Sequence, residues 1–392
     1  MTMDPTNRSS KVIPFWRDVR VLRVVAQIVF VIVLLLIGLT LCNNLTRGMA
    51  KFTTFSFDFL TGTSSLPLAE TTIPYEAHDP MYRAYIVGLL NTLRVIIVGI
   101  FLALILGLIG GVARLSSNWL IARIAAVYVE IFVDTPLLIQ LYFWYVAGVL
   151  QMPRVQQSIA IPGNIFLSNR GLVMPWYDPN ENFGTWLAVI GAAAVLAILL
   201  AIALGRLRQR TLVRDWRALW ALLGFVTVVV IGANVLNPFT VSIPELKGFN
   251  FQGGITLSGM YVSITLGLVL YTGAFITEIV RAGIQAVPRG LTEASRALGL
   301  TYFQTLRLVT VPLALRVIIP PLTNQFLNLA KNSSLASAVA YPDLFFVGGG
   351  IYNMTGQTIQ VVAMMMATYL LISLTISVIM NFVNARFKLV ER

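Results

Sequence analysis

One polar stretch between two apolar segments carries the most specific local pattern in the chain. It reads Pro288-Arg289-Gly290-Leu291-Thr292-Glu293-Ala294-Ser295-Arg296-Ala297-Leu298-Gly299. Leu291, Ala294 and Leu298 are spaced i, i+3 and i+7, which predicts a short helix with one apolar face. Gly299 is well placed to end that helix in a left-handed cap. The stretch therefore predicts a short helix followed by a sharp glycine turn.

A second helix is expected directly after this turn. Thr301 and Gln304 have the spacing of a capping box, which marks a helix start, and the helix is expected to run towards Pro312. Both pieces are expected to lie outside any lipid bilayer. The pattern alone is compatible with an amphipathic element on a membrane surface and with a helix that docks into the groove of a partner.

Apolar runs flank this loop on both sides and dominate the chain. A helix needs about 20 predominantly apolar residues to cross a bilayer. Eight runs qualify, at 22–41, 86–113, 124–150, 185–204, 218–236, 257–280, 313–330 and 358–383. The seventh is expected to be interrupted, because Pro320 and Pro321 remove two helical N–H donors. The sequence therefore predicts an all-α integral membrane protein of about eight transmembrane helices.

The composition excludes the common soluble classes. Of 392 residues, 57% are apolar and 11% are charged, whereas soluble domains carry about 25% charged residues. A disordered chain would be poor in apolar residues. The formal net charge is +12, which favours nucleic acid only where the charge gathers on a solvated face. We therefore expect no nucleic-acid partner.

Scarce residue types exclude several kinds of chemistry. A single cysteine, Cys42, and a single histidine, His78, rule out an intrachain disulfide and a His-pair metal site. No phosphate-binding glycine motif is present. We expect the chain to bind no metal or cofactor directly and to have no enzymatic activity. Any nucleotide would have to be bound by a partner.

Charge in the loops predicts the orientation of the helices. The first apolar run is too long for a signal-peptide core, and no A-x-A site follows it, so we interpret it as a retained anchor. With both termini on one side, the loops of that side hold twenty Lys and Arg residues against seven on the other. Positively charged loops stay in the cytoplasm. Both termini and the 288–312 loop are therefore expected to be cytoplasmic.

Charged residues inside the apolar runs are costly and need an explanation. Arg94 is expected to reach the interface or to pair with a neighbouring acid. Glu130 and Asp134 are four residues apart and share one helix face, followed by Thr135-Pro136 and Gln140. A kinked packing helix and a pore-lining helix both explain this second group, and the residues alone do not decide between them.

Two further patterns concern packing and a polar path. Small residues recur every fourth position at Gly99, Ala103, Gly107 and Gly111, which predicts close helix packing. The seventh run and its sequel bring together amide, hydroxyl and ammonium groups that lipid would not accommodate. These polar residues are Asn324, Gln325, Asn328, Lys331, Asn332, Ser333 and Ser334. They are suited to a water-filled path for a polar solute, or to a helix end at the outer surface.

Several motifs in order resemble the permeases of bacterial ABC importers. Glu293-Ala294-Ser295, Gly299 and Val309-x-Val311-Pro312 closely match the E-A-A-x-x-x-G-x9-I-x-L-P loop of these permeases. Three further stretches resemble the polar amino acid uptake branch: Asn91-Thr92-Leu93, Glu130 with Thr135-Pro136-Leu137-Leu138-x-Gln140, and Lys331-Asn332-Ser333-Ser334-Leu335. The resemblance covers about 86–150 and 257–387. The chain is similar to the permease subunit of general L-amino acid uptake systems in Gram-negative bacteria.

The resemblance implies a fold and a division of the chain. It implies a type I-like permease core with an extra N-terminal helix and an inserted helical hairpin. The expected parts are an anchor and long periplasmic loop (1–83), the first part of the core (84–150), an inserted periplasmic loop and hairpin (151–256) and the second part of the core (257–392). Its location would be the bacterial inner membrane.

The resemblance also implies partners. These are two ATPase subunits, which would hold ATP and Mg, a second related permease subunit, a periplasmic amino acid-binding protein, membrane lipid and an L-amino acid substrate. The resemblance assigns contact with the ATPase, or its coupling to the membrane helices, to seven residues of the 288–312 loop. They are Leu291, Glu293, Ala294, Ser295, Arg296, Gly299 and Pro312.

A zwitterionic amino acid needs donors and acceptors for both of its ends. We therefore expect Thr135, Gln140, Asn324, Ser333 and Lys331 to line its path. Outer loops 42–83 and 151–183 are expected to face the binding protein. The alternative is a stand-alone secondary transporter or channel, which also uses broken helices but often shows inverted repeats. We find no such repeat, and the 288–312 loop has no role in that alternative.

Overall fold

The computed structural model describes residues 19–51, 56–207 and 217–387 of the chain. The chain divides into two compact units, residues 1–60 and residues 61–392, and each is described by itself. Unit 1 contains α1 (Val19–Lys51), in which Leu22–Asn44 is long and apolar enough to cross a membrane. The side chains described in that stretch are exposed, as expected of a helix whose solvent is lipid.

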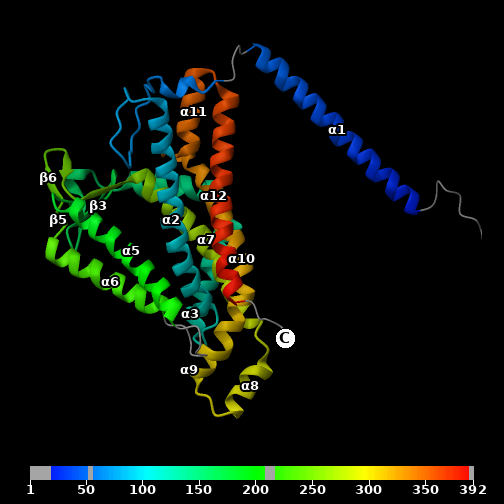
Figure 1. Ribbon diagram of the computed structural model, residues 1–392, viewed down its shortest axis with the longest axis vertical. Helices are drawn as coiled ribbons and strands as arrows, with labels where there is room; N and C mark the ends of the chain where they lie inside the picture. The colour runs from blue at the N-terminus through cyan, green and yellow to red at the C-terminus, as the bar shows by residue number, and fades with distance from the viewer. Residues whose placement is uncertain (1–18, 52–55, 208–216, 388–392) are drawn as a thin grey trace, which may run out of the picture. The chain divides into compact units, whose positions relative to one another are not determined.

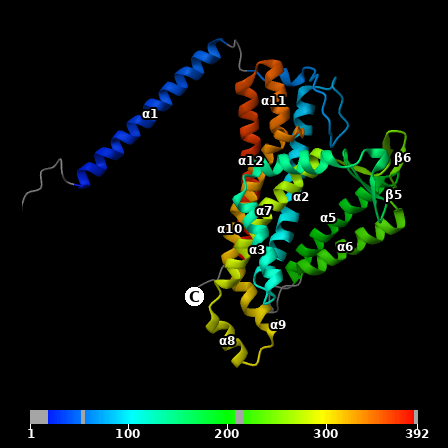
Figure 2. The same ribbon diagram turned by 180° about the vertical axis from the view of Figure 1, so that it is seen from behind.

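Four long helices form the centre of unit 2 (Figures 1 and 2). They are α2 (Met81–Arg114), α7 (Gly259–Gln285), α10 (Val311–Asn332) and α12 (Thr358–Phe387). Two glycines of the predicted stripe pack α2 on α7, whereas Gly99 faces Leu329 of α10. A Cβ added at Gly107 would lie 2.3 Å from Ile276, and one at Gly111 would lie 2.5 Å from Val280. Close approach of the two backbones therefore depends on these glycines.

The third apolar run is strongly bent. Its first part is α3 (Trp119–Asp134), and its second part, Leu137–Gln151, departs from it by 106°. The second part comprises α4 (Leu137–Tyr142), a π-helical turn at Phe143–Gly148 and a 3₁₀ turn at Val149–Gln151. Thr135 has an extended backbone, as residues before proline prefer. The sequence analysis allowed a kink here; the structure shows a sharp break.

The inserted region contains β-structure that the sequence analysis did not predict. A four-stranded antiparallel sheet has the order β1-β2-β3-β8, and two further strand pairs are β4–β5 and β6–β7. The bounds are β1 (Ile159–Ile161), β2 (Ile165–Ser168), β3 (Gly171–Met174), β4 (Trp176–Pro179), β5 (Phe239–Ser242), β6 (Glu245–Lys247), β7 (Asn250–Gln252) and β8 (Ile255–Ser258). Each strand has three or four residues. Such short strands are too brief for an alternating pattern to be recognised.

A helical hairpin projects from this insert, as expected. It consists of α5 (Phe183–Leu207) and α6 (Arg217–Leu236), which pack on each other. The strand pair β4–β5 lies at its base, where Phe239 contacts Phe183 and Trp186. The side-chain amide of Asn182 donates to the carbonyl of Leu236 and closes the base further. The hairpin therefore joins the core through the sheet region.

The predicted loop forms one end of unit 2. It contains α8 (Arg289–Ala297), α9 (Tyr302–Thr305) and a π-helical segment (Leu306–Thr310) that continues directly into α10. The second helix runs towards Pro312 as expected and continues without a break into the seventh apolar run. The expected interruption at Pro320 and Pro321 is absent, since both lie inside α10. Packing of α10 against α7 and α12 supports the helix where its own hydrogen bonds are missing.

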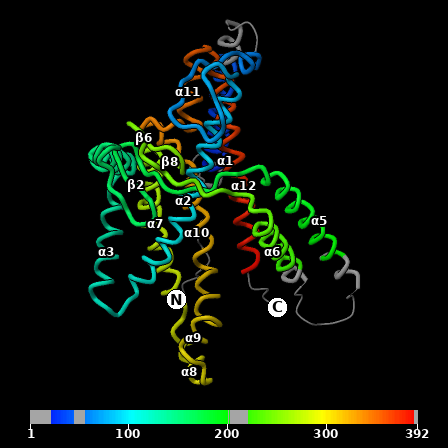
Figure 3. The backbone as a smooth tube through the Cα atoms, turned by 90° about the vertical axis from the view of Figure 1, so that its left-hand side faces the viewer, coloured from blue at the N-terminus to red at the C-terminus, as the bar shows by residue number. Residues whose placement is uncertain are grey.

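The opposite end of unit 2 carries residues 61–80 and α11 (Leu344–Thr355), as Figure 3 shows, and a 3₁₀ helix (Ser333–Val339) follows α10 in the connection to α11. Short 3₁₀ turns also occur at Asp58–Thr61 and Val155–Gln157. α11 packs on α2 and α12. Residues 61–80 are therefore part of the same compact unit as the core.

Among the described residues, six helices are long and apolar enough to cross a membrane, and the bent pair α3–α4 makes a seventh candidate. The apolar part of α6, Ala221–Leu236, is shorter. Eight spans remain compatible with these lengths. Arg8, Lys11, Arg17, Arg208, Arg210 and Arg214, which contribute to the charge asymmetry, lie outside the described residues.

Candidate functional site

The turn after α8 has the geometry that the sequence predicts. Gly299 has φ = +80°, in the left-handed region. Its N–H donates to the Arg296 carbonyl at 2.9 Å, and the N–H of Leu300 donates to the Ser295 carbonyl at 3.1 Å. This pair of bonds is a Schellman motif, which satisfies the last carbonyls of the helix. Gly299 thus ends α8 and sets the direction of the chain that follows.

The predicted capping box then starts the next helix. The side chain of Gln304 accepts from the N–H of Thr301 at 2.8 Å, and the Thr301 hydroxyl accepts from the N–H of Gln304 at 3.3 Å. Pro312 is the second residue of α10 and directly follows the π-helical segment, the kind of irregular turn that often occurs where regular i→i−4 bonding is interrupted. The coupling loop, defined here as residues 288–312, is therefore a short helix attached through a defined turn to a membrane-spanning helix.

One side of the coupling loop carries apolar side chains that no other part of the described chain covers. Leu298, Tyr302 and Phe303 are 82%, 74% and 67% exposed, and Leu291 is 44% exposed. Glu293, Ala294 and Arg296 are exposed beside them. Ser295 differs, because it is buried and its hydroxyl donates to the Leu291 carbonyl at 2.6 Å. The exposed set has the composition of a docking surface, with apolar residues flanked by charges.

The break between α3 and α4 is closed by Gln140. Pro136 has no N–H, so the Phe132 carbonyl one turn earlier loses its helical donor. The Gln140 amide donates to that carbonyl and to the Thr135 carbonyl, each at 2.9 Å. The Thr135 hydroxyl donates to the Ile131 carbonyl at 2.7 Å. Gln140 is 5% exposed, so in this structure it holds the bend and has little exposed surface.

Two acids on α3 point away from the rest of the chain. Glu130 and Asp134 are exposed, and neither forms a salt bridge within the described residues. They share one face of a helix whose remaining exposed residues include Ile124 and Ile131. Carboxylates on a lipid-facing surface are costly. This face of α3 is therefore suited to an aqueous path or a protein partner.

The predicted polar run on α10 divides into exposed and buried members. Asn324, Asn328 and Lys331 are exposed and spaced along one helix face. Ser333 is 1% exposed, and its hydroxyl donates to the Ala330 carbonyl at 2.8 Å. Of the predicted path residues, Asn324 and Lys331 thus lie on an exposed polar face, whereas Gln140 and Ser333 are buried and bonded to backbone.

Arg94 pairs with an acid from the outer loop. Its Nη1 lies 2.6 Å from Oε1 of Glu70, whose side chain is 9% exposed. The guanidinium also lies over the Tyr261 ring, 4.1 Å from its centroid. The Ser258 hydroxyl donates to the other oxygen of Glu70. Sequence analysis identified Arg94 but not this partner, because Glu70 lies 24 residues away in an irregular loop.

A second buried polar centre joins α2 to the start of α11. The Thr92 hydroxyl accepts from the N–H of Leu344 at 2.8 Å, and the Asn91 amide donates to the Pro342 carbonyl at 2.9 Å. Asp343 is fully buried and caps α11 by accepting from the N–H of Phe346 at 2.9 Å. Burial raises the pKa of the Asp343 carboxyl to about 7. Sequence analysis missed Asp343, although an Asp before an apolar run is a helix-start signal.

A match to a family model shows which protein family the chain belongs to. Residues 96–389 match the family of binding-protein-dependent transport system inner membrane components. The chain belongs to this family. It is a multi-pass membrane permease component, and its role is transport through the membrane without catalysis of its own. The matched region contains α7, the coupling loop, α10 and α12, which together form most of the core.

Relatives along the full chain are permeases of one kind of transporter. The chain is 42% identical over 366 residues to the putative amino-acid ABC transporter permease protein YhdX of Escherichia coli K12, covering 91% of each chain. It is 39% identical to the general L-amino acid transport system permease protein AapQ of Rhizobium johnstonii, covering 93% of this chain and 92% of that one. It is 40% identical to the glutamate/glutamine/aspartate/asparagine transport system permease protein BztB of Rhodobacter capsulatus, across the whole of both chains.

A solved structure is also similar. The crystal structure of an amino acid ABC transporter with histidines matches 78% of this chain and 94% of its own, with a TM-score of 0.47 and 21% identity. The inserted sheet and hairpin lie within the stretch aligned to the full-length relatives, because those alignments cover more than nine tenths of the chain.

Proposed function

We propose that this chain is the permease subunit of an ATP-driven importer that carries polar L-amino acids from the periplasm to the cytoplasm. The observation that carries the proposal is the exposed coupling loop, joined through Gly299 to a membrane-spanning helix. Relatives at about 40% identity over more than nine tenths of the chain, named as amino-acid permeases, support the substrate class.

The coupling loop has the properties of a lever driven by a separate motor. Leu291, Leu298 and Tyr302 would insert into a groove of an ATPase subunit, while Glu293 would pair with one of its arginines. α9, the π-helical segment and α10 follow one another without a break. Movement of the loop would therefore be transmitted along α10. ATP and Mg would be held by two such ATPase subunits and not by this chain.

Both termini and the coupling loop would face the cytoplasm, as the charge asymmetry predicts. The exposed acids Glu130 and Asp134 favour a second permease subunit. A helix face with two carboxylates avoids lipid either in the solute path or at an interface with another subunit. A secondary transporter would also have acidic residues within its membrane helices. That alternative, however, leaves the exposed coupling loop without a partner.

The path would be lined by the exposed polar faces of α10 and α3. Asn324, Asn328 and Lys331 offer donors and acceptors along α10, and Thr135 lies at the break beside Asp134. A zwitterion needs such groups at both ends. Gln140 and Ser333 would not line the path but would support it from buried positions. Gln140 would do so by holding the bend that positions Thr135.

The binding protein would dock on the outer loops at the end of unit 2 opposite the coupling loop. Residues 61–80 lie at that end, and the other outer loop, the insert at 151–183, lies nearer to the middle of unit 2. Glu76 is exposed, and Tyr177 is 62% exposed. A cysteine introduced at Tyr177 should form a crosslink to the binding protein, and a lack of crosslinks from both loops would contradict docking there.

Uptake in a strain lacking the system tests the proposed substrate class. Restoring this chain with its neighbouring components should restore uptake of labelled L-amino acids. Asn324→Leu should reduce uptake at least tenfold with normal membrane insertion, whereas Val317→Leu, an exposed apolar control on the same helix, should leave uptake unchanged. Equal uptake by Asn324→Leu and the parent would remove α10 from the path.

A further inference from the structure

The four-stranded sheet of the insert presents two chemically different faces. Leu172 pairs with Leu257 and Met174 with Ile255 across β3 and β8, so these four side chains share one face. Val173 and Thr256 form the next pair and lie on the other face. The first face is entirely apolar. It needs an apolar surface opposite it.

A cavity of about 470 Å³ lies between this face and the core helices. α2 contributes Val98 and Leu102, and α7 contributes Val262, Leu266 and Val269. Within the part of the chain that the structure describes, no side chain from α5 or α6 lines this cavity. The cavity is therefore an open groove on two membrane-spanning helices, roofed by the sheet.

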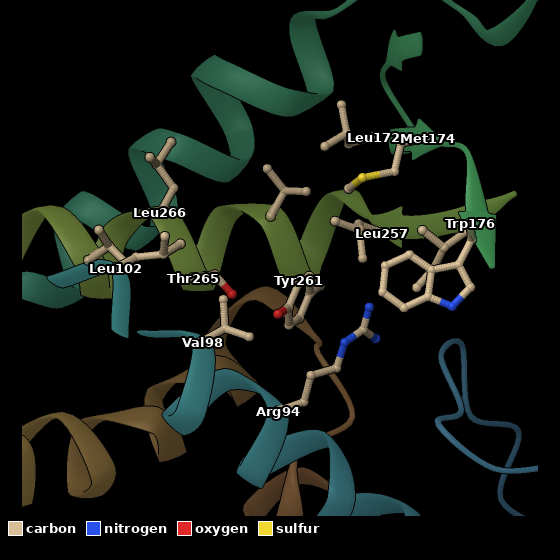
Figure 4. Close-up of a pocket in the computed structure, with 13 residues that line it drawn as sticks. Arg94, Val98, Leu102, Leu172, Met174, Trp176, Leu257, Tyr261, Thr265 and Leu266 are labelled. Carbon is tan, nitrogen blue, oxygen red and sulfur yellow. The ribbon is translucent and has the colours of Figure 1, made fainter. Parts of the chain in front are cut away.

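The charged group lies at one end of the groove, and the Thr265 hydroxyl lies nearer its middle, as Figure 4 shows. The Arg94 guanidinium points towards the end where Trp176 lies, and Leu102 and Leu266 lie towards the other end. Arg94 uses Nη1 for Glu70 and retains further N–H donors. Trp176 is 48% exposed and carries an indole N–H. Arg and Trp are residue types that meet lipid headgroups at membrane interfaces.

Size and chemistry exclude the other classes of occupant. Ten residues of helix, 10–12 Å wide and 15 Å long, occupy on the order of 1,000 Å³, so a spanning helix is too large for the groove and would collide with the sheet. An amino acid would place its carboxylate at Arg94, but its ammonium group would then lie along the aliphatic wall, where no acidic side chain of the described residues lines the groove. A flexible hydrocarbon chain with a polar head meets neither obstacle.

We propose that this groove is a binding site for a membrane phospholipid. One acyl chain lies between α2 and α7 beneath Leu172, Met174, Ile255 and Leu257, and the phosphate meets the free N–H groups of Arg94 and Trp176. The lipid thereby covers the apolar face of the sheet and fills the space beside the core. This site is independent of which solute the permease carries.

Photolabelling of the assembled transporter in lipid nanodiscs tests the site. The probe is a phospholipid with a diazirine near the end of one acyl chain, and labelled peptides are identified by mass spectrometry. Labelling should concentrate on the α2 and α7 peptides that contain Leu102 and Leu266. Val98→Trp, which fills the groove, should reduce this labelling at least fivefold.

The control variant lies one residue away. Ile97 is 65% exposed and does not line the groove, so Ile97→Trp should leave the labelling unchanged. A diacylglycerol probe with the same diazirine but no phosphate should label several-fold less than the phospholipid. Equal labelling of Val98→Trp and Ile97→Trp would overturn the site. So would crosslinks from a photoreactive residue at Leu266 to α1 or to a partner subunit in place of lipid.

Discussion

At the scale of single residues, two polar side chains within the apolar helices are satisfied by specific partners from distant parts of the chain or from the backbone. Arg94 was expected to meet a neighbouring acid, and the structure provides Glu70 from a distant loop. Gln140 was expected to line a path, and it is buried against the carbonyls of Phe132 and Thr135. Residue type indicates that a group must be satisfied. Only tertiary structure shows which group satisfies it.

Gln140→Leu should destabilise the bend between α3 and α4. The variant keeps similar volume but leaves two buried carbonyls without donors, at a cost of about 1–3 kcal/mol each. We expect a lower thermal unfolding midpoint of the purified transporter and reduced uptake. Gln151→Leu, at an exposed site in the same segment, is the control and should have the parental midpoint. A parental midpoint in Gln140→Leu would contradict the bracing role.

Asp343 should make stability depend on pH. Because burial raises the pKa of its carboxyl to about 7, the native state keeps a proton that the unfolded chain releases near pH 4. The stability of the native state should therefore fall as pH rises from about 4 to about 7 and then level off, by a few kcal/mol at most.

Asp343→Asn provides the comparison for this pH dependence. Asn also caps helices well, and it cannot titrate. The unfolding midpoint of the variant should fall less between pH 5 and pH 8 than that of the parent. Parallel midpoint curves for the two proteins would show that Asp343 titrates normally.

At the scale of elements, the coupling loop was the most predictable feature. Its helix, left-handed Gly299 and capping box all depend on residues within a few positions of one another. Local patterns of this kind are visible in sequence. The continuity of α9 with α10 was missed, because Pro312 suggests a boundary and the structure places it inside the first helical turn.

Gly299→Val should disrupt coupling while leaving membrane insertion intact. A side chain in the left-handed region costs roughly 1–2 kcal/mol, so the chain should leave this conformation and α8 should turn away from its partner. ATP-dependent uptake should fall at least tenfold. Gly290→Val places the same side chain in α8, where the glycine has open space, and it should retain more uptake. Full uptake by Gly299→Val would contradict the role of the turn.

The α2–α7 interface was predicted from its small residues, and its sensitivity can be measured. A Cβ at Gly107 would overlap Ile276, so Gly107→Val should cost about 1–3 kcal/mol through overpacking. We expect a lower yield of folded protein and a lower unfolding midpoint. Gly191→Val on α5, where nothing lies within 4 Å, is the matched control. Similar unfolding midpoints for Gly107→Val and Gly191→Val would contradict the tight packing of α2 on α7.

At the scale of the whole molecule, hydropathy indicated a multi-pass membrane protein, the motifs resembled importer permeases, and the family match confirms that class. The short strands of the insert were not predicted, because each has only three or four residues and because β3 pairs with β8 across more than 80 residues. Their position explains how a hairpin of two apolar helices is attached to the core. The phospholipid groove beneath the sheet also arises only from this long-range pairing.

The central claim is that this chain carries amino acids when a separate ATPase pushes on its coupling loop. The most direct measurement is uptake of labelled L-glutamate into proteoliposomes containing this chain and its neighbouring subunits, with binding protein outside and ATP inside. We predict uptake that requires both ATP and binding protein and is lost in Gly299→Val. Uptake without ATP, driven by an ion gradient, would contradict the account and favour a secondary transporter.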